Sequence, residues 1–174
     1  MLKFLFQQKI QTLDLHEYLI NGYDEKLAKK YNIRPGVGIA APQVDVLKKM
    51  FVIVAYDEHD ELHEYGVINP KIVSQSEELT YLKYGEGCLS VDREVKGLVH
   101  RPKRITVEFD SFDFDNEITI HTKMRLKGYI AVVFQHEYDH LFGKLFIDHI
   151  NKENPFFVPS NSSPVHFDFE DEEK

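Results

Sequence analysis

The chain has 174 residues and a formal net charge of −8, from 21 basic and 29 acidic side chains. This length fits one domain spanning residues 1–174, and the 43% of hydrophobic residues suffice for a core. The acidic balance supplies no basic face, so we expect no direct nucleic-acid binding. The sequence contains no run of about 18 apolar residues, so we expect no membrane span. A single cysteine, Cys88, favours a reducing compartment and so indicates the cytoplasm.

The first periodic segment of the chain predicts an amphipathic helix from about Thr12 to Tyr31. Apolar residues recur there at four-residue spacing: Leu15, Leu19, Tyr23 and Leu27. Pro35 and Gly36 stop this helix. A glycine-rich loop follows, with the sequence GVGIAAPQ at 36–43.

Short strands dominate the middle of the chain. Alternating or β-branched stretches predict strands at 51–56, 65–73, 79–84, 104–112 and 117–126. A second helix is expected from about Tyr129 to Phe142, ended by Gly143, followed by a last strand at 145–150. The acidic end, from about residue 155 to residue 174, is expected to be a flexible tail. The fold class is therefore α+β, with small mixed or antiparallel strands packed around a central helix and one N-terminal helix.

The late helix carries an HExxH pattern formed by His136, Glu137 and His140. Positions i and i+4 differ by about 40° around a helix, so both imidazoles leave one face and can reach one metal ion. A glutamate beside them can take a proton from a water on the metal. Since the preceding IAVVF makes this helix apolar nearly all round, burying these polar groups requires a reason. The motif alone leaves a pair of solvent-facing histidines as an equally good interpretation.

A catalytic site of this kind usually takes three protein ligands. Cys88 is the candidate for the third, because it lies on a glycine-flanked turn, GEGCLSVD at 85–92, and would bind a metal as a thiolate. Considered alone, a lone cysteine is more simply an inert small residue. His149 follows Gly143 without ligand spacing. We expect ordinary polar contacts for it and for the other histidines outside the motif, at positions 16, 59, 63, 100, 121 and 166.

Three stretches together resemble the signature motifs of peptide deformylases. They are GVGIAAPQ at 36–43, EGCLS at 86–90 and QHEYDHL at 135–141. Each is modest alone, but the three in this order and spacing are very specific. The resemblance extends from about residue 12 to about residue 150, and it favours the class common in Gram-positive bacteria. The Pro-x-Leu-Arg-like stretch that usually precedes the first helix in the family is not found.

The resemblance implies a metal centre. Cys88, His136 and His140 match the metal ligands of the family, and Glu137 matches its general acid and base. It also implies one divalent cation, Fe²⁺ in the cell, for which Zn²⁺, Ni²⁺ or Co²⁺ can substitute. A thiolate with two imidazoles suits such softer ions better than Ca²⁺ or Mg²⁺.

The same resemblance implies a substrate. Gln43 and the Leu89 backbone N–H match the donors to the formyl oxygen, and Gly38 matches a backbone position that lines the substrate cleft. The expected reaction removes the formyl group from N-formylmethionine at the start of nascent polypeptides and releases formate. The expected partners are therefore N-formylmethionyl nascent peptides, and the ribosome is a further candidate.

Two other functions compete with this one. A general HExxH metallopeptidase would cleave internal peptide bonds, but it does not explain GVGIAAPQ or EGCLS. A catalytically idle relative would serve as a binding module, although the intact Gln43, Cys88 and Glu137 argue against decay. The glycine-rich 36–43 lacks the third glycine or Lys-Ser/Thr of a nucleotide loop, so that function is rejected.

Overall fold

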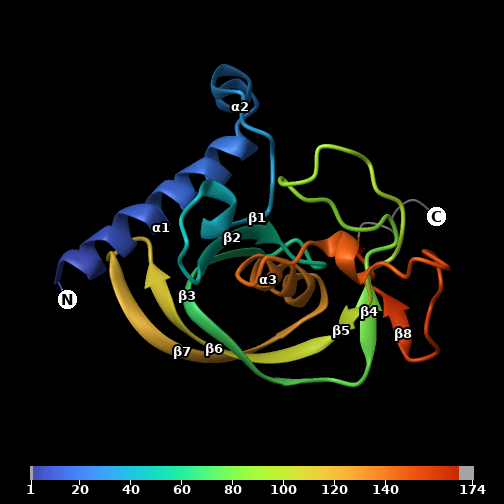
Figure 1. Cartoon of the computed structure of the whole chain (residues 1–174). Coiled ribbons are helices and arrows are strands. Elements are labelled where there is room, and N and C mark those ends of the chain that lie inside the picture. The colour runs from blue at the N-terminus through green and yellow to red at the C-terminus, as the bar shows by residue number, and fades with distance from the viewer. Residues whose placement is uncertain (1, 169–174) are drawn as a thin grey trace.

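The computed structural model describes residues 2–168, with side chains from Gln11 onward (Figure 1). The α-helices are α1 (Leu2–Tyr23), α2 (Glu25–Tyr31) and α3 (Gly128–His140). The strands are β1 (Gly38–Ala40), β2 (Met50–Tyr56), β3 (Leu62–Gln75), β4 (Leu79–Tyr81), β5 (Arg101–Pro102), β6 (Arg104–Asp113), β7 (Ile118–Lys127) and β8 (Ser162–Pro164). Two short 3₁₀ helices span Ala41–Val44 and Phe146–His149.

The strands form two sheets. An antiparallel five-stranded sheet has the order β1-β2-β3-β6-β7, and a three-stranded sheet has the order β5-β4-β8. The second sheet is mixed, since β4 pairs antiparallel with β5 and parallel with β8. The predicted α+β class, with strands around a central HExxH helix, is confirmed.

The large sheet curves around α3, which lies in its hollow (Figure 1). Register irregularities between Ile68 and Lys71, and again between Ile72 and Ser74, interrupt the pairing of β3 with β6. Such bulges bend and twist a strand, which explains the curvature. The predicted alternation of β6 is confirmed, because every second residue from Ile105 through Val107 to Phe109 is buried.

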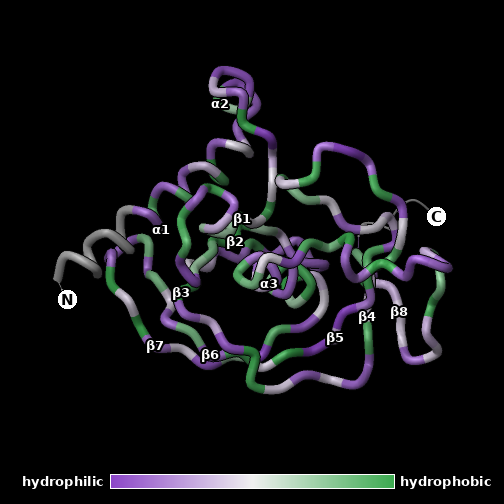
Figure 2. Tube along the Cα trace, viewed as in Figure 1, coloured by the Kyte–Doolittle hydropathy of each residue, from purple (hydrophilic) through white to green (hydrophobic). Residues whose placement is uncertain are grey.

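Among the described residues, a small apolar cluster contains Cys88, Val99 and Phe146, and two larger clusters fill the body. One lies between α3 and the inner face of the sheet, where the Phe134 ring packs edge-on against Phe51 at a centroid distance of 5.0 Å. The other lies between α1 and the first strands, and Leu15 and Leu19 belong to it. Both leucines were predicted on the apolar face of the first helix. Helix α2 has no buried residue, projects from the body (Figure 1) and is largely hydrophilic (Figure 2).

The predicted N-terminal helix is in fact two helices. α1 ends at Tyr23, and the side chain of Asp24 accepts hydrogen bonds from the backbone N–H groups of Lys26 and Leu27, which caps α2. A capping aspartate offers the backbone an alternative to the continuing helix. The four-residue apolar spacing continues from α1 into α2, so the sequence pattern does not reveal where the first helix ends.

Three further elements differ from the prediction. The strand expected at 145–150 is wrong: residues Phe146–His149 form a 3₁₀ helix, whose entry is fixed by the Asp148 carboxylate accepting from the Leu145 backbone N–H at 2.8 Å. The glycine-rich loop at 36–43 contains strand β1. The strand expected at 79–84 ends at Tyr81.

The segment that was expected to be a flexible tail makes defined contacts as far as Asp168. β8 pairs with β4, and the Val165 backbone N–H donates to Tyr81 O at 2.9 Å while its side chain is buried. Residues 169–174 lie outside the described part of the chain. Among the described residues, no helix combines the length and apolar character needed to cross a membrane.

Candidate active site

Helix α3 carries the HExxH residues into the interior. Its residues from Ile130 to Glu137 are all buried, as is His140. The helix starts at Gly128, whose φ of 58° is left-handed, and the Glu58 carboxylate accepts from the next backbone N–H, that of Tyr129, at 3.0 Å. A side chain at Gly128 would collide with that carboxylate. A carboxylate at this end also complements the helix dipole.

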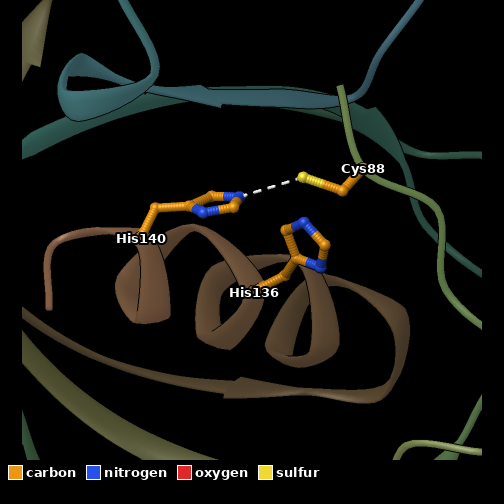
Figure 3. Close-up of side chains that lie close together, drawn as sticks. All are labelled: Cys88, His136 and His140. Carbon is orange, nitrogen blue, oxygen red and sulfur yellow. Dashed lines mark hydrogen bonds between the residues drawn. The ribbon is translucent and has the colours of Figure 1, made fainter. Parts of the chain in front are cut away.

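The loop between β4 and β5 brings Cys88 against the two histidines. Figure 3 shows the thiol directed at the side chains of His136 and His140 from α3. Cys88 Sγ lies 3.3 Å from His140 Nε2, and ligand atoms of all three residues lie within 4.8 Å of one another. The structure thus assembles the predicted three-ligand group from two separate parts of the chain, and these donors suit a softer divalent cation.

The local electrostatics favour a thiolate. Burial raises the pKa of the Cys88 thiol, but hydrogen bonds with His136 and His140 outweigh it and bring the pKa to about 5. The backbone N–H of Ser90 also donates to Cys88 Sγ at 3.4 Å. A metal ligand must be deprotonated, so a cysteine with this pKa is prepared for metal binding at neutral pH.

A buried network of charged side chains holds His136 through a hydrogen bond to Glu86. Glu86 Oε2 accepts from His136 Nδ1 at 2.8 Å, which leaves Nε2 directed at the ligand group. Arg101 donates to both Glu86 oxygens, at 2.6 and 2.9 Å, and to Asp139 at 2.9 Å. Carboxylates in this position fix the tautomer and orientation of a metal-binding histidine. Sequence reasoning missed Glu86, Arg101 and Asp139, because only the folded chain brings them together.

One carboxylate oxygen of Glu137, beside the ligand group, has no hydrogen-bond partner among the described residues. This oxygen is Oε2, and the side chain that carries it is buried. Burial raises the pKa of this carboxyl to about 7, although the neighbouring His136 and His140 lower it. A buried carboxylate oxygen without a partner is costly and calls for an explanation, which makes Glu137 a candidate for contact with a group outside the protein chain.

Gly38 makes room for that carboxylate. A Cβ at Gly38 would lie 2.5 Å from Glu137 Oε1 and 2.7 Å from Cδ, closer than real Cβ contacts. The sequence predicted Gly38 as a backbone position in the cleft, and it does line the cavity. The structure adds that the glycine is needed for the approach of β1 to α3.

Gln43 and Leu89 lie at the same site. Gln43 Oε1 accepts from the Ala40 backbone N–H at 2.8 Å, which turns its Nε2 toward Ser90 Oγ, at 2.9 Å, and Cys88 Sγ, at 3.7 Å. The Leu89 backbone N–H follows Cys88 directly and has no acceptor within residues 2–168. Both predicted donors therefore stand beside the ligand group.

A cavity of about 330 Å³ opens in front of these residues. The predicted site residues Gly38, Gln43, Cys88, Leu89, His136 and Glu137 all line it. Apolar side chains line it as well: Leu82, Tyr129, Val132 and Val133.

Arg34 joins the two walls of this cavity. It donates to the backbone oxygens of Cys88, at 2.5 Å, and Val91, at 2.9 Å. These bonds tie the segment before β1 to the loop that carries the thiol. Arg34 was not singled out from the sequence.

Other histidines make the expected polar contacts. His149 Nε2 bonds Asp139 at 2.8 Å, outside the ligand group. A second acidic group contains Asp57, Glu61 and His63. The Asp57 oxygens there are taken up by backbone N–H groups of its own turn and by His63, so a tight turn accounts for it.

Two candidate ligands from an HExxH helix, a third candidate from a facing loop and a nearby carboxylate match the arrangement of metal-dependent hydrolases. That is the class of protein that the fold and the site define. The sequence matches the model of the polypeptide deformylase family over residues 5–156. The chain belongs to the polypeptide deformylase family. It is a hydrolase that removes the N-formyl group from nascent polypeptides, in a family whose members depend on a metal.

Individual relatives agree with this. Peptide deformylase 2 from Bacillus cereus is 51% identical over 152 residues, covering 87% of this chain and 80% of that protein. The peptide deformylase of Listeria monocytogenes is 54% identical over 153 residues, covering 88% and 81%. These relatives fit the predicted resemblance to the Gram-positive class.

Solved structures show the same fold. Peptide deformylase from Thermotoga maritima superposes with a TM-score of 0.54 at 36% identity, covering 72% of this chain and 75% of that chain. Peptide deformylase 1B from Arabidopsis thaliana gives a TM-score of 0.62 at 25% identity, covering 84% and 70%.

Proposed function

We propose that Cys88, His136 and His140 hold one divalent cation, Fe²⁺ in the cell, with Zn²⁺, Ni²⁺ or Co²⁺ able to take its place. The thiolate-forming pKa of Cys88 and the mutual approach of the three ligand atoms support this. When bound, such an ion lowers the pKa of water and polarises a carbonyl oxygen.

Glu137 is the proton carrier of the proposed reaction. The observation that carries this role is its buried Oε2, which has no partner within the described chain and lies beside the ligand group. A pKa raised by burial to about 7 suits a group that both takes and returns a proton near neutral pH. Glu137 would take the proton of the attacking water and pass it to the leaving amine.

Gln43 and the Leu89 N–H stabilise the developing oxyanion. Attack on the formyl carbon places negative charge on its oxygen, and fixed donors that face this oxygen need no reorganisation during the reaction. Gln43 Nε2 is aimed by the bond from Ala40 N–H to its own Oε1. The Leu89 N–H is free of acceptors among residues 2–168.

The peptide binds along β1. This strand ends the five-stranded sheet, and within residues 2–168 β2 is its one pairing partner, so its other edge can receive an extended chain. Gly38 of this strand lines the cavity. The apolar side chains of Leu82, Val132 and Val133 line the cavity and suit the side chain of a first methionine.

We also propose that the protein acts in the cytoplasm on N-formylmethionyl nascent chains, with the ribosome as a partner. The single cysteine and the nature of the substrate support this location. Direct binding to nucleic acid is not part of the proposal, because the chain carries a net charge of −8.

Formate release tests the proposed function. We expect the purified protein to release formate from a formyl-Met peptide and no acetate from the matching acetyl-Met peptide. Cleavage of internal peptide bonds without formate would instead identify a general metallopeptidase. Binding without turnover would identify an idle relative.

A further inference from the structure

The C-terminal segment Ser162–Asp168 runs from the small sheet to the start of α3. β8 pairs with β4, and Val165 follows as a buried residue. The backbone N–H of Asp168 then donates to Glu58 O at 3.0 Å, and its carboxylate bonds His59 Nδ1 at 2.9 Å. The segment is therefore fixed at both ends.

Phe167 lies between these two anchors and contacts the cleft wall. Its ring meets the ring of Tyr129 edge-on, at a centroid distance of 5.3 Å and an interplanar angle of 64°. Edge-to-face pairs of this kind are favourable beyond the area that they bury. Tyr129 is a lining residue of the substrate cavity, and Phe167 is not.

Two contacts hold Tyr129, one at its backbone and one at its ring. Its backbone N–H donates to the Glu58 carboxylate, and its ring packs against Phe167. Since Asp168 bonds the backbone of Glu58, the same turn anchors both contacts. The Tyr129 hydroxyl has no hydrogen-bond partner within the described residues, so packing sets the orientation of its ring.

Tyr129 shares one face of α3 with Val132 and Val133, three and four residues further on. All three line the apolar part of the cavity, which in the proposed function receives the first side chain of the peptide. A small rotation of the Tyr129 ring would therefore change the width of the cavity at this end and leave the ligand group in place.

We propose that Phe167 is a positioning residue for substrate selectivity: through Tyr129 it sets the shape of the cavity that receives the first side chain of the formyl peptide. The inference rests on the proposed function. It assigns to the C-terminal segment a role in choosing methionine over a shorter residue, and no role in metal binding or proton transfer.

The test compares Phe167→Ala with the unchanged protein on a formyl-Met peptide and a formyl-Ala peptide. We expect kcat/KM for the formyl-Met peptide to fall about 3- to 10-fold, mainly through KM, which corresponds to losing one aromatic pair. The formyl-Ala peptide, kcat and metal content should change little. Phe167→Tyr keeps the ring and should restore the preference for methionine.

Phe157→Ala is the matched control, because Phe157 is an exposed aromatic residue that precedes the Ser162–Asp168 segment and does not line the cavity. It should keep the original selectivity. A double-mutant cycle tests the route: in a Tyr129→Ala background, Phe167→Ala should alter selectivity no further.

Selectivity in Phe167→Ala equal to that of the unchanged protein would overturn the inference. Equal losses on both peptides, with loss of metal or a lowered Tm, would overturn it in favour of a purely structural role. Neither result would affect the proposed function, which fails only if the unchanged protein releases no formate.

Discussion

At the scale of single residues, the site depends on two features of Gly38 and Glu137. Gly38 has no side chain, which leaves space for the Glu137 carboxylate, and Glu137 Oε2 has no hydrogen-bond partner among the described residues. A close approach of this kind requires glycine for steric reasons. The family resemblance predicted both residues, but the contact between them became visible only in the folded chain.

Gly38→Ala tests this contact. The added methyl group would displace the Glu137 carboxylate, so we expect turnover to fall at least tenfold while the three ligands keep their metal. Steady-state kinetics and elemental analysis would show this. Gly22→Ala is the control, because the nearest atoms to a Cβ there lie at 3.5 and 3.6 Å, an ordinary contact. Full activity in Gly38→Ala would mean that the carboxylate position is not critical.

Cys88→Ala tests the third ligand. No other thiol exists in the chain, so we expect the variant to lose its metal on dialysis and its activity with it. Metal content read by elemental analysis measures the loss. His149→Ala should keep the metal, because His149 bonds Asp139 outside the ligand group. Full occupancy in Cys88→Ala would place the third ligand elsewhere.

At the scale of elements, buried charges join α3 to the segments beside it. Glu86 and Arg101 come from the loop after β4 and from β5, and Asp139 comes from α3 itself. Removing one partner of such a buried network leaves an uncompensated charge, which is strongly destabilising. The network therefore ties the thiol-bearing loop to the helix that bears the histidines.

The stability of this network should depend on pH. Burial raises the pKa of Glu86, but hydrogen bonds with His136 and Arg101 outweigh it and bring the pKa to about 2, below its unfolded value of 4.5. The stabilisation is therefore present above about pH 4.5 and is lost as the pH falls toward 2. Its size is roughly 3 kcal/mol.

Glu86→Gln should abolish this part of the pH dependence. Urea unfolding at stepped pH should give a gap in unfolding free energy between the unchanged protein and the variant that narrows from pH 4.5 toward pH 2. Glu78→Gln removes only an exposed partner of Arg104 and should show almost no gap. A gap that stays constant with pH would refute the assignment.

Elements that depend on one local pattern could be predicted from the sequence. The alternation in β6 and the apolar run in α3 located those elements correctly. The break at Asp24 and the 3₁₀ helix at Phe146–His149 were missed, because single side-chain caps decide them against the local propensity. The parallel pairing of β8 with β4 joins residues far apart in sequence and has no local signal.

At the scale of the whole molecule, the fold brings three distant motifs to one cavity. The curved sheet supplies β1, and the 3₁₀ helix that follows it supplies Gln43. The loop between β4 and β5 supplies Cys88, and the enclosed α3 supplies the histidines (Figure 1). The resemblance of three motifs predicted which residues would meet. It could not predict the Glu86–Arg101–Asp139 network or the contact of Phe167 with Tyr129, since both depend on tertiary packing.

The central claim is that the ligand group holds the metal and Glu137 alone carries the proton. Glu137→Gln tests it most directly, since the amide keeps the size of the side chain and removes the base. Formate release and metal content should be measured on the same preparation. We expect turnover to fall by about 10²–10⁴-fold, with metal content and affinity for the formyl-Met peptide unchanged. Full activity, or an emptied metal site, would contradict the account.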